Sequence, residues 1–193
     1  MTAPRTTPVF AMLLALSAVI LSVLPFVSTF DEALTALGMR LGIGAPLQAV
    51  VPLEVSLTAA LLTLFGIHAG AAGDHLVVWG PSGVPQTLLI SWNCVGWQSM
   101  ILLGLSFAVG LRGPIAWASR LEVILVGILG TVLVNLARIA IVGVLAAAAG
   151  YLPTVLFHDY GGTLLLVAWL FLFWLIAFRW LLPTPELVLE PAA

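Results

Sequence analysis

The sequence predicts an all-α fold, a polytopic transmembrane helical bundle of about five spans. Hydrophobic residues make up 62% of the 193 residues and charged residues only 7%, with a mean hydropathy of +1.22. These values lie far outside the range of soluble domains. The connecting stretches are too short and too apolar to build a second core, so residues 1–193 are expected to form a single integral membrane domain. The net charge of -2 offers no basic patch for nucleic acid.

The N-terminal part of the chain contains two long apolar stretches. Pro8 to Val27 is long enough for one spanning helix and lacks a clear cleavage site, so it is interpreted as a retained helix rather than a signal peptide. Phe30 to Leu47 is less apolar and contains charged residues, which favours a position along the membrane interface. A second spanning helix fits from about Ala45 to Ile67, with Pro52 and Glu54 near its beginning.

The pattern changes between Gly70 and Ser91. Two apolar runs, Leu76 to Trp79 and Thr87 to Ile90, flank a turn over Gly80 to Gly83. Such a pattern predicts a short hairpin or lid that lies over the membrane rather than within it.

Three further helices follow. Cys94 to Val109 is the third, and Arg112-Gly113-Pro114 ends it. The run from Ile115 to Ala149 would measure ~50 Å as a straight helix, longer than a hydrocarbon core of ~30 Å, so it must tilt, bend or protrude. The last span is expected over Thr163 to Leu182.

The arginines predict the orientation. If His68 to Asn93 faces outside, four arginines lie on the cytoplasmic side and only Arg5 lies outside, as the positive-inside rule favours. The four are Arg40, Arg112, Arg120 and Arg179. An additional crossing within Phe30 to Leu47 is the alternative. The sequence thus indicates a multi-pass protein of the cell membrane whose partner is the lipid bilayer.

The only cysteine, Cys94, stands in the polar stretch Ser91 to Ser99 just before an apolar run. Backbone N–H groups at the start of a helix favour a thiolate, so this position is suited to a reactive cysteine. Taken alone, a single cysteine is more often a small hydrophobic filler. The orientation above places Cys94 at the outer end of its helix.

Arg138 is the second candidate because an arginine within an apolar helix costs about 2.5 to 3.5 kcal/mol on insertion scales and needs a partner or a polar cavity. Asn135 stands one turn earlier on the same helical face. The alternative is a purely structural role, in which Arg138 reaches lipid phosphate or pairs with Asp159 as an anchor. His158, in the expected outer loop, is the third candidate, so three separate segments bring Cys, Arg and His to one membrane face.

Metal binding is the weaker alternative. His68, Asp74 and His75 lie in a glycine-rich stretch without helical ligand spacing. We therefore expect no metal and no cofactor.

The three candidates define one chemistry. A thiolate nucleophile needs a base or positive neighbour, and acyl transfer needs donors aimed at the developing oxyanion. Cys94 would attack a peptide carbonyl, His158 would exchange protons, and Arg138 would stabilise thiolate or oxyanion. Resolution by water makes a protease, and resolution by another amine makes a transpeptidase.

The sequence resembles the exosortase/archaeosortase family of membrane-embedded processing enzymes. Three motifs carry the resemblance, in the family's order and within residues 80–182: Asn93-Cys94-Val95-Gly96, Asn135-x-x-Arg138, and His158 followed by Gly161-Gly162. One departure is Val95, where a small polar residue is common in the family.

This resemblance implies a catalytic triad of Cys94, Arg138 and His158, with Asn93, Asn135 and Asp159 in support. It implies substrates that are exported proteins with a C-terminal sorting signal, made of a short motif, a transmembrane helix and a basic tail. The enzyme would cleave the signal and transfer the protein to a cell-surface acceptor. The alternative function is a non-catalytic membrane scaffold or a small transporter subunit, in which Cys94 need not lie near Arg138 or His158.

Overall fold

The computed structural model describes residues 7–182. Four helical segments among them are long and apolar enough to cross a membrane: Gly44–Leu64, Trp92–Gly110, Trp117–Ala148 and Tyr151–Leu181. The prediction of a polytopic helical membrane protein is therefore confirmed. In chain order, the elements are α1 (Thr7–Leu41), α2 (Gly44–Gln48), α3 (Val51–Leu64), β1 (Ala69–Ala72), β2 (His75–Trp79), β3 (Pro85–Leu89), the 3-10 turn η1 (Trp92–Cys94), α4 (Trp97–Gly110), α5 (Trp117–Ala148), α6 (Tyr151–Leu156), the π-helical turn η2 (Phe157–Gly161), α7 (Gly162–Ile176) and the π-helical turn η3 (Ala177–Leu181).

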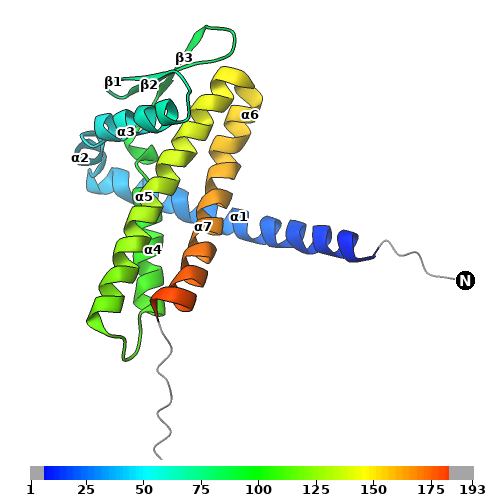
Figure 1. Cartoon of the computed structure of the whole chain (residues 1–193), viewed down its shortest axis with the longest axis vertical. Helices are drawn as coiled ribbons and strands as arrows, with labels where there is room; N and C mark the ends of the chain where they lie inside the picture. Colours follow the sequence, from blue (N-terminus) through cyan, green and yellow to red (C-terminus); the bar gives the residue numbers. More distant parts are fainter. Residues whose placement is uncertain (1–6, 183–193) are drawn as a thin grey trace, which may run out of the picture.

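Helices α4, α5 and α7 run alongside one another as a bundle (Figure 1). Their shared core contains Leu103 from α4, Val123 from α5 and Phe173 from α7, all almost fully buried. The predicted break at Gly113-Pro114 forms the loop between α4 and α5. Large apolar and aromatic side chains pack tightly in this core. Because lipid tails are as apolar as these side chains, van der Waals packing rather than the hydrophobic effect holds the helices together.

The length of α5 has a structural use. Its 32 residues span ~48 Å at 1.5 Å per residue, and its upper part runs alongside α6 (Figure 1). There Ile139 and Ala140 join a second core with Leu76 and Val78 of the sheet. The sequence predicted only that so long a helix would tilt, bend or protrude. In the structure, its upper part supports the sheet.

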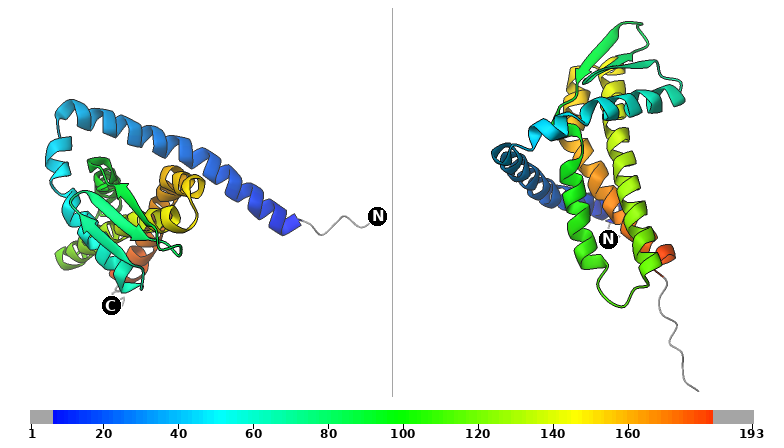
Figure 2. Two further views of the ribbon diagram at one scale, coloured as in Figure 1. Left: turned by 90° about the horizontal axis from the view of Figure 1, so that it is seen from above. Right: turned by 90° about the vertical axis from the view of Figure 1, so that its left-hand side faces the viewer.

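The predicted hairpin is a three-stranded antiparallel sheet in the order β1-β2-β3. The turn at Gly80 to Gly83 joins β2 to β3, as expected, and β1 adds a strand that the apolar pattern did not predict. Helix α3 contacts β1 and β2 and runs across the bundle direction below the sheet (Figures 1 and 2). The sheet, α3 and the upper part of α5 therefore form one layered unit above the bundle.

Helix α1 is continuous over the first expected span and through most of the stretch expected at the interface. It runs across the bundle rather than along it, and its N-terminal half extends away from the other helices (Figure 2). Helix α2, which follows α1, contacts η1. Arg40, in the last turn of α1, therefore lies toward the end of the molecule that carries Cys94.

The expectation that four arginines share one end is wrong for Arg40. Arg112 and Arg120 flank the α4–α5 loop, and Arg179 lies in η3, which contacts α5 at the same end. Hydropathy and charge counts do not specify the direction of a helix, which explains the misplacement. Arg5 lies outside the described residues.

Candidate functional site

Cys94 ends a single 3-10 turn that follows β3 directly. The sequence predicted that the helix begins at this cysteine, but α4 begins only at Trp97. Gly96 makes the junction with a φ of 75°, a left-handed conformation that disfavours other residues. The thiol is half-buried, and its sulfur lies 3.8 Å from Ser91 Oγ. Cys94 is thus held by a tight turn between the sheet and the bundle.

Asn135 of α5 fastens this turn to the long helix. Its buried amide donates one hydrogen bond to the Cys94 carbonyl oxygen at 2.9 Å and another to Glu54 Oε1 at 2.6 Å. A Cβ on Gly96 would lie 2.8 Å from Asn135 Cγ. The Asn-Cys-x-Gly and Asn-x-x-Arg motifs therefore contact each other, and glycine is required for their close approach.

Asn93 supports the turn from the opposite side. Its side-chain oxygen accepts hydrogen bonds from Gln98 Nε2 at 2.6 Å and from Thr35 Oγ1 at 3.1 Å. These contacts tie η1 to α4 and α1. Val95, the departure from the family pattern, packs against the core between α3, the sheet and α5.

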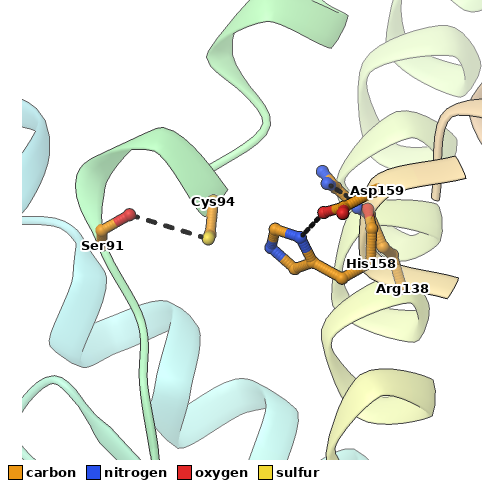
Figure 3. A network of polar contacts seen from close by, with 5 residues as sticks. All are labelled: Ser91, Cys94, Arg138, His158 and Asp159. Carbon is orange, nitrogen blue, oxygen red and sulfur yellow. Dashed lines mark hydrogen bonds and ion pairs between the residues drawn. The ribbon is translucent and has the colours of Figure 1, made fainter. Parts of the chain in front are cut away.

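His158 lies in the π-helical turn η2, within a helical segment that runs unbroken from α6 into α7. The sequence predicted an outer loop here, after the break at Gly150 to Pro153. Instead, the chain stays helical and makes one π-helical turn, in which each N–H bonds the carbonyl five residues earlier. The His158 ring faces the Cys94 thiol (Figure 3), and the two residues line the same cavity.

Asp159 orients this imidazole. Its Oδ1 lies 2.9 Å from His158 Nδ1, and an ionised carboxylate can only accept a hydrogen bond. Nδ1 therefore carries a proton, and the neutral ring has its lone pair on Nε2, the nitrogen toward Cys94 (Figure 3).

Arg138 completes the cluster from α5. It donates a long hydrogen bond of 3.4 Å to the backbone carbonyl of His158, and Asp159 pairs with His158 instead. Within residues 7–182, no carboxylate forms an ion pair with Arg138. A Cβ on Gly162 would lie 2.9 Å from Arg138 Cδ and closer still to Nε, so the Gly-Gly motif makes room for this side chain.

Two small cavities meet at Arg138. One, of about 80 Å³, is lined by Cys94, Arg138 and His158 together with Leu88, Leu89 and Ile90. The other, of about 50 Å³, lies on the α1 side and is lined by Asp31, Gln98 and Asn135 among others. Arg138 thus borders both the cavity that the thiol lines and a second, more polar one.

Sequence reasoning missed two carboxyl groups of this site. Glu54 of α3 is 8% exposed, and Asp31 of α1 lines the cavity behind Arg138. Arg138 lines the same cavity as Asp31, and Asn135 links Glu54 to the turn that carries Cys94. Glu54 is an ionisable residue in an apolar run, and this is the same signal that identified Arg138 as a candidate. Asp31 carries no comparable signal, because its neighbourhood arises only from the direction of α1.

The histidines considered for metal binding lie apart from this site. His75 Nδ1 pairs with Asp74 Oδ1 at 2.6 Å, and His68 precedes β1. Among the residues that the structure describes, no three His, Cys, Asp or Glu side chains are grouped as metal ligands would be.

The fold and this cluster define a class: a multi-pass helical membrane protein with a thiol, an imidazole and a guanidinium around one cavity. The family model of the transmembrane exosortases matches residues 2–175. The chain belongs to the transmembrane exosortase family. It is therefore, in general terms, a membrane enzyme of protein sorting that acts on exported proteins with sorting signals. No curated protein and no solved structure matches the chain.

Proposed function

We propose that this protein is a cysteine-dependent protease or transpeptidase that cleaves the C-terminal sorting signal of exported proteins. The observation that carries the proposal is the meeting of Cys94, His158 and Arg138, from three separate elements, around one cavity. A scaffold has no need of this convergence. Family membership supports the same reaction class.

In the proposed reaction, His158 Nε2 takes the proton of the Cys94 thiol, and the thiolate attacks the carbonyl carbon of the scissile peptide bond. The carbonyl oxygen becomes an oxyanion, which the Arg138 guanidinium stabilises. Collapse of this intermediate breaks the C–N bond, and His158 returns its proton to the leaving amine. The product is a thioester between Cys94 and the N-terminal part of the substrate.

The thioester is resolved by a second nucleophile. Attack by water releases a free carboxylate, while attack by an amine of a cell-surface acceptor forms a new amide. Both routes regenerate the thiol. We further propose that the site faces the extracytoplasmic side, since Arg112, Arg120 and Arg179 gather at the opposite end of the bundle, where the positive-inside rule favours the cytoplasm.

The test is co-expression with an exported protein from the same genome that bears a C-terminal motif, a transmembrane helix and a basic tail. Mass spectrometry of its C-terminus is compared between wild-type enzyme and Cys94→Ala. We expect a shortened or newly linked C-terminus with the wild type alone. Equal processing by both enzymes would overturn the proposal.

A further inference from the structure

Strand β3 is an edge strand, and no other strand of the described residues pairs with its outer side. The sheet order puts β3 at one edge, and Pro85, Gln86, Thr87 and Leu89 are exposed. Both edge strands contact a helix, β1 on α3 and β3 on α5. Edge strands usually carry charges that prevent pairing with other chains, whereas β3 has no charged residue over its whole length. Its edge is therefore available to another strand.

The backbone groups that point outward can be assigned. The Ile90 N–H donates to the Asp74 carbonyl at 2.9 Å, in register with the β2–β3 ladder. Successive residues of an antiparallel strand alternate between the two sides. Leu88 therefore bonds toward β2, while Thr87 and Leu89 direct N–H and C=O outward. Pro85 also directs its backbone groups outward. Its lack of an N–H therefore removes no hydrogen bond to β2.

This unpaired strand edge adjoins the proposed catalytic cavity. Leu88, Leu89 and Ile90 line that cavity together with Cys94. At about 80 Å³, it has room for only a few water molecules. A reacting carbonyl group fits such a space, but the peptide residues on either side of it do not. They must lie on the adjoining exposed surface, and β3 is part of that surface.

From this geometry we propose that the substrate segment flanking the scissile bond binds in an extended conformation as a fourth strand on β3. Main-chain hydrogen bonds to Thr87 and Leu89 would hold it, and pockets beside alternate side chains would select its sequence. The proposal rests on the proposed function. It assigns the sheet the role of substrate platform beside the proposed catalytic cavity.

Proline substitution tests the outward N–H groups. Thr87→Pro removes one without touching the bonds to β2, and Thr87→Val retains it in a side chain of similar shape. We expect kcat/KM for the exported substrate to fall about tenfold in Thr87→Pro relative to Thr87→Val. The rate of Cys94 alkylation by a small thiol reagent should match between the two, which shows that the site is intact. Equal processing by both variants would overturn the strand pairing.

Cross-linking gives an independent readout that does not depend on proline. Thr87→Cys in the Cys94→Ala background is paired with single cysteines placed at successive positions around the cleavage point of the substrate. Strand pairing predicts disulfides at every second substrate position. A helical period, or no cross-link at any position, would contradict it. If the wild type itself fails to process the substrate, the proposed function fails; if it processes the substrate while these two tests fail, only the strand pairing is wrong.

Discussion

The side-chain amide of Asn135 donates a hydrogen bond to the Cys94 backbone carbonyl at 2.9 Å. This contact joins the turn that carries the thiol to the helix that carries Arg138. The other N–H of the same side-chain amide donates a hydrogen bond to Glu54 Oε1. One buried asparagine therefore links α3, η1 and α5. The position of the thiol relative to the guanidinium therefore depends on Asn135.

Replacement of Asn135 should loosen the site. Asn135→Ala leaves the Glu54 carboxylate without its donor, and a buried group that loses its partner costs about 1–3 kcal/mol. We expect this loss in detergent-based unfolding, together with altered alkylation of Cys94. Val132→Ala, on an exposed face of the same helix, is the control. Wild-type stability of Asn135→Ala would refute the linking role.

Glu54 should tolerate glutamine better than alanine. Glu54→Gln keeps a side-chain oxygen to accept from Asn135, whereas Glu54→Ala removes the acceptor and leaves a cavity. The alanine variant should therefore be less stable than the glutamine variant by about 1–3 kcal/mol, measured by the same unfolding assay. Equal stability of the two would show that the Asn135–Glu54 bond contributes little.

Gly96 should not accept a side chain. Gly96→Ala combines a left-handed φ of 75° with a Cβ 2.8 Å from Asn135 Cγ, and strain of this kind costs about 1–3 kcal/mol. Gly104→Ala is the matched control, since a Cβ there meets no atom within 4 Å and alanine favours a helix interior. Loss of stability and processing is expected in the first variant only. If both variants behave as the wild type, the close approach of residue 96 to Asn135 does not require glycine.

The protein's helical segments could be predicted from its sequence, but their directions could not. The run from Ile115 to Ala149 carries a clear apolar signal and forms α5 nearly as predicted. Nothing in the hydropathy of Pro8 to Val27 shows that α1 runs across the bundle, because a helix of given length is equally apolar in any direction. Asp31 therefore escaped notice, since only the course of α1 brings it toward Arg138.

The site shows the same division. Cys94, Arg138 and His158 were identified from residue type and setting, and they do lie around one cavity. The segment around His158 was predicted as a loop after the break at Gly150 to Pro153, but it forms a π-helical turn between two helices. The roles of Asn93 and Asn135 also could not be separated by sequence. Asn135 holds the Cys94 carbonyl, whereas Asn93 bonds Gln98 and Thr35.

His158 should control the reactivity of the thiol. If its imidazole draws the thiol proton, His158→Ala should slow alkylation of Cys94 at neutral pH by about tenfold, since the thiolate is the reactive form. Processing should fall by about 10²–10⁴, as expected for loss of a general acid–base group. Asp159→Asn should give a smaller decrease, because the ring remains but loses its charged orienting partner. An unchanged rate of Cys94 alkylation in His158→Ala would show that the imidazole does not activate the thiol.

The most direct measurement of the central claim is a search for the thioester between Cys94 and the substrate. Enzyme co-expressed with the exported substrate is quenched in acid, digested and analysed by mass spectrometry, with and without hydroxylamine, which cleaves thioesters. We predict a Cys94 peptide whose sulfur is bonded to the new C-terminal residue of the cleaved substrate. This adduct should be lost with hydroxylamine and should be absent from Cys94→Ser. Substrate processed normally by Cys94→Ala, with no adduct on the wild-type cysteine, would contradict the account.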